Sequence, residues 1–178
     1  MSDLPFNVLF LCTGNSARSI MAESILAKDG TGKFRAFSAG SHPKHTVNPL
    51  AIETLQKLGY PIDDLRAKSW DDFDAPDAPP MDFVITVCDN AAGEVCPIWP
   101  GHPIRAHWGI EDPSSVEGSR HDKLTAFATA ARLLRNRIAL FVALPRSRLE
   151  SESAPQMLQA IGKSEGGSAG VNAADAVA

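Results

Sequence analysis

The residues best suited to chemistry lie near the N-terminus, where Cys12 is followed by five small residues and then by Arg18 and Ser19. The five between them are Thr13, Gly14, Asn15, Ser16 and Ala17. Small residues can curl so that their backbone N–H groups converge on one oxyanion, and the planar guanidinium of Arg18 can bind two of its oxygens. The same positive field favours a thiolate at Cys12, and Ser19 can donate to its sulfur or cap a helix. We therefore predict that Cys12 and Arg18 are catalytic and that residues 13–19 bind the substrate.

The elements that must position this segment alternate between strands and helices. Short apolar runs predict strands over Asn7–Leu11, Phe34–Ala39, Phe83–Val87 and Ile104–Trp108. Apolar spacings of three and four predict helices over Arg18–Asp29, Pro49–Leu58 and Arg120–Phe141. This alternation indicates an α/β fold with parallel strands. The alternative for Cys12 is a buried cysteine at a strand end before an ordinary capped helix, but the full spacing of Cys12, Arg18 and Ser19 favours a site.

Composition limits the class of protein. The chain has 178 residues, 44% of them hydrophobic, and a formal net charge of −4, which suits one globular domain and argues against a nucleic-acid partner. No apolar run approaches the roughly 20 residues of a membrane span, and no signal peptide is evident, so we expect a cytoplasmic protein without membrane contact. Ser, Gly, Ala and Glu dominate the C-terminal part. We expect a domain over residues 1–149 and a disordered tail over residues 150–178, of which residues 155–178 can be deleted without loss of activity.

The segment VLFLCTGNSARSIMAE resembles the signature of the low-molecular-weight protein tyrosine phosphatase superfamily. The resemblance extends over residues 6–145. It implies a four-stranded parallel sheet flanked by helices, with the nucleophilic cysteine loop after the first strand. Because the superfamily also contains arsenate reductases of the same fold, the loop alone leaves the reaction open.

The second signature of the superfamily is a late Asp-Pro, whose aspartate is the general acid. Here it is Asp112-Pro113, which makes Asp112 the candidate that protonates a leaving oxygen. Taken alone, Asp-Pro is a common turn dipeptide. In phosphatases of this fold tyrosines follow it, whereas this chain has Ser114 and Ser115 there and a single tyrosine, Tyr60.

A phosphatase of this type needs one cysteine, whereas this chain has three: Cys12, Cys88 and Cys96. An odd and small number argues against a structural disulfide framework. The segment Val84–Pro113 is similar to the redox segment of arsenate reductases of this fold, which implies catalytic roles for Cys88 and, as the resolving thiol, Cys96. In thioredoxin-coupled members six residues separate these two cysteines, whereas here seven do.

Two other interpretations of the later cysteines stay open. Cys88, Cys96, His102 and His107 could bind zinc, although their spacing matches no compact zinc motif. Free cysteines are also common in hydrophobic cores, which suits Cys88 at a strand end better than Cys96. We expect no metal ion in the site.

The resemblance implies reduction of arsenate to arsenite through a Cys12–arsenate adduct and a cascade of cysteine disulfides. No bound cofactor is expected, and the electrons would come from an external thiol reductant, either thioredoxin or glutathione with glutaredoxin. Arsenate and this electron donor are the expected partners. The alternatives are a small phosphatase that uses the same Cys12, Arg18 and Asp112, and a sensor that holds arsenite with three thiols.

Some arsenate reductases of this fold bind potassium beside the loop, at positions that match Asn15, Glu23 and Ser38 and a fourth that is Lys68 here. An ammonium group at that position would replace the cation. The alternative is that Lys68 is a solvated surface charge.

Overall fold

Four parallel strands form the centre of the fold. The computed structural model describes residues 3–89, 91, 99 and 101–164. Within them the strands are β1 (Phe6–Cys12), β2 (Phe34–Gly40), β3 (Phe83–Thr86) and β4 (Ile104–His107), in the spatial order β2-β1-β3-β4. The predicted four-stranded parallel α/β fold is confirmed. Because the strands are parallel, their carboxyl ends meet at one edge, where Cys12 pairs with Gly40 and Thr86 pairs with His107.

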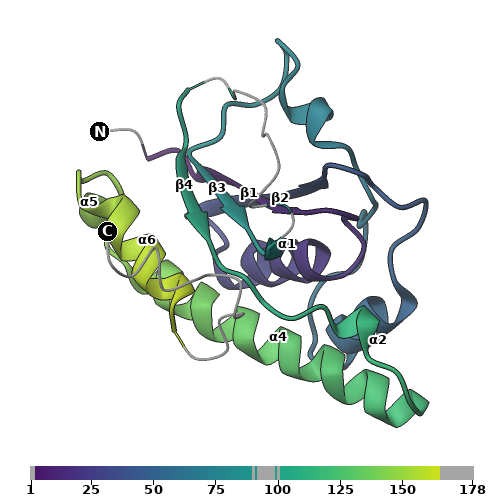
Figure 1. Cartoon of the computed structure of the whole chain (residues 1–178). Helices are drawn as coiled ribbons and strands as arrows, with labels where there is room; N and C mark the ends of the chain where they lie inside the picture. Colours follow the sequence, from purple (N-terminus) through teal and green to yellow (C-terminus); the bar gives the residue numbers. More distant parts are fainter. Residues whose placement is uncertain (1–2, 90, 92–98, 100, 165–178) are drawn as a thin grey trace.

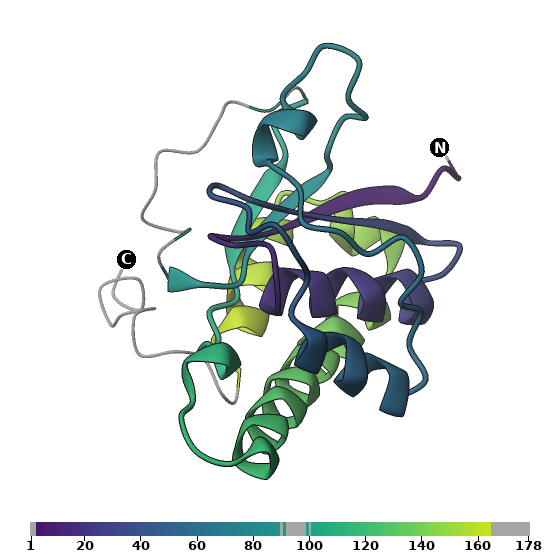
Figure 2. The ribbon, with the colours of Figure 1, turned by 90° about the vertical axis from the view of Figure 1, so that its right-hand side faces the viewer.

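Helices α1 (Arg18–Asp29) and α4 (Arg120–Ala143) cover one face of the sheet, and α2 (Pro49–Lys57) packs against both of them (Figures 1 and 2). The three helices begin and end close to the predicted residues. Ser119 and Asp122 form a capping box at the start of α4, which satisfies two backbone donors there. Among the described residues, no helix is both long and apolar enough to cross a membrane.

Alternation along β1 divides its side chains between two cores. Val8 and Phe10 face the main core between the sheet and helices α1 and α4, whereas Leu9 and Leu11 face a smaller core on the opposite side. All four are fully buried. This two-sided burial explains why the sequence of β1 is a continuous apolar run.

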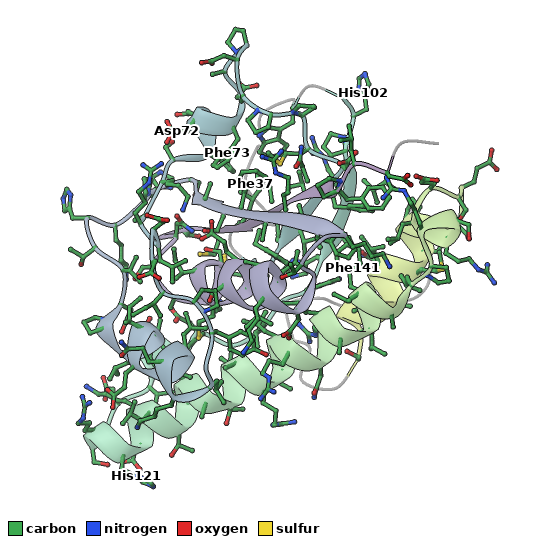
Figure 3. The ribbon with its side chains drawn as sticks, turned by 180° about the vertical axis from the view of Figure 1, so that it is seen from behind. Phe37, Asp72, Phe73, His102, His121 and Phe141 are labelled. Atoms are coloured by element: carbon green, nitrogen blue, oxygen red, sulfur yellow. The ribbon has the colours of Figure 1, made fainter. Side chains whose placement is uncertain are left out.

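The smaller core is closed by a short 3-10 helix, η1 (Trp70–Phe73). The rings of Phe37 and Phe73 lie 5.7 Å apart on this side of the sheet. Figure 3 shows the two rings together and Phe141 on the opposite side. Trp99 also packs in this core and is 2% exposed.

The chain beyond α4 corrects the predicted disordered tail. After α5 (Arg146–Leu149) comes α6 (Ala154–Gly162), which packs against β4 and α4 (Figure 1). Ala154 and Leu158 are fully buried, and Ile161 is 8% exposed. These residues form one short apolar stripe at spacings of four and three, which the surrounding Ser, Gly and Glu obscure in the sequence. Residues 165–178 lie outside the described residues, so the prediction of disorder there is untested.

Candidate active site

The predicted oxyanion loop lies at the carboxyl edge of the sheet, between Cys12 at the end of β1 and Arg18 at the start of α1. Ligands of α/β proteins bind at this edge of a parallel sheet. Ala17, the N-cap residue of α1, makes no side-chain capping hydrogen bond. The N–H groups of the first turn are therefore not occupied by a cap and suit an anion, which the helix dipole also favours.

The neighbouring connection between β2 and α2 turns the loop carbonyls outward. Three backbone hydrogen bonds of 2.9 Å do this: His42 N to Thr13 O, Lys44 N to Gly14 O, and Asn48 N to Ser16 O. Because these carbonyl oxygens are engaged outside the loop, the loop can present its N–H groups to its centre. The geometry suits a bound oxyanion.

Asn15 and two glycines give the loop its shape. Asn15 has a φ of +44° and its Oδ1 accepts a hydrogen bond of 2.8 Å from the backbone N–H of Lys68. Gly14 leaves room for the side chain of Lys44, because a Cβ at Gly14 would lie 3.3 Å from that side chain. At Gly40 a Cβ would lie 2.5 Å from the carbonyl oxygen of Thr13, so only glycine allows β2 to approach the loop this closely.

The sulfur of Cys12 accepts hydrogen bonds from within the loop. Asn15 N donates to it at 3.2 Å, and Ser19 Oγ lies 2.8 Å from it. Asn15 Nδ2 donates to the same Ser19 oxygen at 2.8 Å, so the hydroxyl hydrogen of Ser19 is directed to the sulfur. Hydrogen bonds of this kind stabilise a thiolate more than a thiol. Cys12 is 4% exposed, and its environment fits the predicted nucleophile.

Arg18 and Asp112 face each other across the mouth of the loop. Arg18 Nη1 donates to the carbonyl of Ile110 at 2.9 Å, and Arg18 Nη2 lies 3.6 Å from the Asp112 carboxylate. Asp112 Oδ1 accepts hydrogen bonds from Ser114 N at 2.9 Å and from Ser114 Oγ at 2.7 Å. The side chain of Asp112 is 38% exposed, so solvent reaches its carboxyl group. The structure thus places the predicted acid beside Arg18 at the mouth of the loop.

A cavity of about 200 Å³ opens above the loop. Its lining includes Cys12, Arg18 and Asp112, together with His42, Lys44 and Ser114. The volume is below that of a pocket for a drug-sized ligand and suits a small oxyanion. The sequence prediction missed His42 and Lys44, although the basic run Ser41–His45 next to the end of a strand was a signal that could have revealed them.

Cys88 lies one strand away from Cys12, just beyond the end of β3, and is 1% exposed. Both Cys12 and Cys88 are free thiols in the structure. The Thr13 hydroxyl lies 3.6 Å from the Cys88 sulfur, which also accepts a 3.4 Å hydrogen bond from Ala91 N. Cys96 lies outside the described residues.

The zinc interpretation gains no support from the described residues. The two ring nitrogens of His107 lie 2.6 Å from Thr86 Oγ1 and 2.8 Å from Asp89 Oδ1, so both already have protein partners. His102 is exposed and lies two residues before the start of β4, on the side of the sheet that carries the smaller core (Figure 3). No group of three or more His, Cys, Asp or Glu that could hold a metal ion occurs in the part of the chain that the structure describes.

Lys68 is a buried residue that supports the loop, and its ammonium group is not a solvated surface charge. Its Nζ lies 3.8 Å from Glu23 and 3.4 Å from Ser38 Oγ, and donates to the carbonyl of Arg66 at 2.7 Å. Burial raises the pKa of Glu23 despite the nearby ammonium group, and burial lowers the pKa of Lys68 despite the carboxylate. An internal cation therefore lies beside Glu23 and Ser38, on the same residue whose backbone N–H donates to Asn15 of the loop.

Comparison with known proteins places this site in a family. The sequence profile of the low molecular weight phosphotyrosine protein phosphatases matches residues 7–154. The chain belongs to this family. Its curated relatives include the arsenate reductase of Halalkalibacterium halodurans, 36% identical over 134 residues that cover 75% of this chain and 93% of the relative. The arsenate reductase of Bacillus subtilis is 34% identical over the same shares of the two chains.

Solved structures of the phosphatase family resemble this one. A structure described as an arsenate reductase in the phosphate binding state has a TM-score of 0.64 at 29% identity, and the match covers 78% of this chain and 97% of that chain. The low molecular weight protein tyrosine phosphatase of T. tengcongensis has a TM-score of 0.60 at 28% identity, covering 75% and 95% of the two chains. The thioredoxin-dependent arsenate reductase of Corynebacterium glutamicum has a TM-score of 0.53 at 26% identity, covering 79% and 65%.

Proposed function

We propose that this protein reduces arsenate to arsenite, with Cys12 as the nucleophile and Cys88 as the second thiol. The observation that carries the proposal is the buried Cys88 sulfur, 3.6 Å from the Thr13 hydroxyl of the Cys12 loop. Hydrolysis of a phosphate ester uses one thiol, whereas reduction of As(V) to As(III) needs two electrons, which two thiols supply when they form a disulfide. The arsenate reductases among the relatives support this choice.

In the first step the Cys12 thiolate attacks the arsenic atom of bound hydrogen arsenate. An S–As bond forms and an As–O bond breaks, and the proton of Asp112 allows the departing oxygen to leave as water. Arg18 and the loop N–H groups hold the remaining oxygens. The 3.6 Å approach of Arg18 to Asp112 brings the acid and the anion-binding group to one cavity.

In the second step Cys88, after losing its proton, attacks the Cys12 sulfur. The new S–S bond displaces arsenic, which keeps the electron pair of the broken S–As bond and leaves as arsenite. Arsenic has then gained two electrons, and Cys12 and Cys88 have been oxidised to a disulfide. Thr13 lies between the two elements that carry these thiols, so its hydroxyl can orient the Cys88 sulfur.

Regeneration requires a further thiol. We assign this role to Cys96, whose attack on Cys88 would free Cys12 and leave a Cys88–Cys96 disulfide for an external reductant. The thioredoxin-dependent arsenate reductase among the structural neighbours supports thioredoxin as that reductant. Glutathione with glutaredoxin is the other candidate.

Hydrolysis of phosphate esters is the second candidate function, because Cys12, Arg18 and Asp112 are also what that reaction needs and the family profile is that of phosphatases. The mouth of the cavity does not favour aryl esters. Ser114 lines it, while Tyr60, the single tyrosine of the sequence, is buried and hydrogen-bonded to Asp29 and Arg135.

The Cys88→Ser variant distinguishes the two functions. We expect it to lose arsenate-dependent consumption of reduced thiol under every reductant, because the second electron donor is gone, while p-nitrophenyl phosphate hydrolysis stays at the wild-type level, however low that is. Cys12→Ser is the matched control and should lose both activities. If Cys88→Ser reduces arsenate at the wild-type rate, Cys88 is not the second thiol.

A further inference from the structure

Arg137, on α4, is a buried cation that the steps above do not use. Its side chain has no exposed surface, and its Nη1 donates to the carbonyls of Trp108 at 2.9 Å and Gly109 at 3.1 Å. Among the residues that the structure describes, no hydrogen-bond partner lies near its Nε or Nη2 and no carboxylate forms an ion pair with it. Burial lowers the pKa of its guanidinium. A buried cation without a counter-charge is unfavourable for stability, so a hydrophobic side chain would fill this space better unless the two hydrogen bonds serve the site.

The two carbonyls to which Arg137 donates, those of Trp108 and Gly109, lie on the same short segment as Ile110 and Asp112, which contact Arg18. The N–H groups of Trp108 and Ile110 donate to the end of β3, at Thr86 O and Val87 O, over 2.7 and 3.1 Å. The carbonyl of Ile110 accepts the 2.9 Å hydrogen bond from Arg18 Nη1, and Asp112 follows two residues later. Residues 108–110 are therefore held on their N–H side by β3 and on their carbonyl side by two arginines.

The two partners that the structure shows for the Arg18 guanidinium are the Ile110 carbonyl and Asp112, which both lie directly after Gly109 on the segment 108–112. The direction of that guanidinium therefore depends on the orientation of the Ile110 carbonyl. A peptide plane can rotate when ψ of one residue and φ of the next change in opposite directions. The carbonyl of one residue therefore reorients together with the carbonyls next to it. Gly109, between Trp108 and Ile110, lacks a side chain that would restrict such rotation. The hydrogen bonds from Arg137 Nη1 to the Trp108 and Gly109 carbonyls oppose this rotation.

We propose that Arg137 is a positioning residue for oxyanion binding: it fixes the Trp108 and Gly109 carbonyls, and through them the Ile110 carbonyl that aims Arg18 at the cavity. A lysine at position 137 has one donor nitrogen on a flexible side chain and would restore part of the hydrogen bonding to these carbonyls. A methionine fills the volume without donating a hydrogen bond. The inference rests on the proposed function only in requiring that the cavity bind a tetrahedral oxyanion.

The test measures binding of inorganic phosphate, which needs no turnover. Isothermal titration gives the dissociation constant for wild type, Arg137→Met, Arg137→Lys and the matched control Arg135→Met, which removes a guanidinium of the same helix that contacts Tyr60 and not the 108–112 segment. We expect Arg137→Met to weaken phosphate binding about tenfold, Arg137→Lys to weaken it less, and Arg135→Met to leave it unchanged. Alkylation of Cys12 by iodoacetamide, followed by peptide mass, should stay within about twofold in all variants, because the loop around the sulfur is intact.

A double-variant cycle decides whether Arg137 acts through Arg18. In an Arg18→Lys background, Arg137→Met should weaken phosphate binding by less than about twofold, because the group it positions is already absent. Wild-type affinity in Arg137→Met, or an equal loss in both backgrounds, would overturn the proposal. If Arg137→Met does not fold, phosphate affinity is compared in the same two backgrounds for Arg137→Lys and Arg137→Gln. Failure of wild type itself to bind phosphate or arsenate would refute the proposed function instead.

Discussion

Replacing Leu158 by alanine tests whether α6 belongs to the folded domain. Leu158 is fully buried in the main core, and its carbonyl accepts a hydrogen bond of 2.9 Å from the indole of Trp108. Truncation of a buried leucine to alanine costs about 2–5 kcal/mol, from lost burial and from the cavity left behind. Taking about 3 kcal/mol, and about 2–4 °C per kcal/mol for a chain of this size, we expect Tm to fall by about 6–12 °C.

Thermal unfolding followed by circular dichroism measures this loss. The matched control is Leu140→Ala on α4, because Leu140 is 50% exposed and should change stability by less than about 0.5 kcal/mol. Two truncations extend the test: a stop after residue 164 should leave Tm unchanged, and a stop after residue 153 should lower it at least as far as Leu158→Ala does. Equal Tm values for Leu158→Ala and Leu140→Ala would show that α6 does not pack against β4 and α4.

Three further substitutions test the site and its support. Asp112→Asn should slow formation of the Cys12–arsenate adduct in a single turnover by about 10²–10⁴-fold, and an unchanged rapid-quench rate would remove it as the acid. Lys68→Met leaves Glu23 buried without its cation and should lower stability by about 3–5 kcal/mol; potassium chloride, but not tetramethylammonium chloride, should restore part of the loss in denaturant titrations. Hydrogen bonds from the Ser119 backbone and side chain lower the pKa of Asp122, so its cap stabilises the fold above about pH 4 and less as the pH falls through the folded pKa. The stability difference between wild type and Asp122→Ala should therefore shrink on acidification, and a difference that is constant with pH would contradict this.

The sheet and the nucleophile loop could be predicted because local sequence determines them. The apolar run of β1 is buried on both faces, and Cys12 and Arg18 stand where β1 ends and α1 begins. The prediction of a disordered tail was wrong for α6, Ala154–Gly162. It failed because α6 is short and is held by tertiary contacts, such as the bond from Trp108 to Leu158, that local composition does not reveal.

The contributions of distant residues to the site could not be predicted for the same reason. Lys44 lies over Gly14, and the carbonyl of Ile110 holds Arg18, only because the β2–α2 connection and the segment after β4 meet the loop in space. Asp112 could be predicted by resemblance, and its place beside Arg18 is now visible. Cys96 lies outside the described residues, so its role stays a prediction.

The most direct test of the central claim is disulfide mapping after one turnover without an external reductant. Reduced Cys96→Ser protein is mixed with excess arsenate, quenched with acid and alkylated, and its peptides are identified by mass while arsenite is quantified. The account predicts one arsenite for each protein chain and a disulfide that joins Cys12 to Cys88. Arsenite formed while Cys88 remains a free thiol would contradict it.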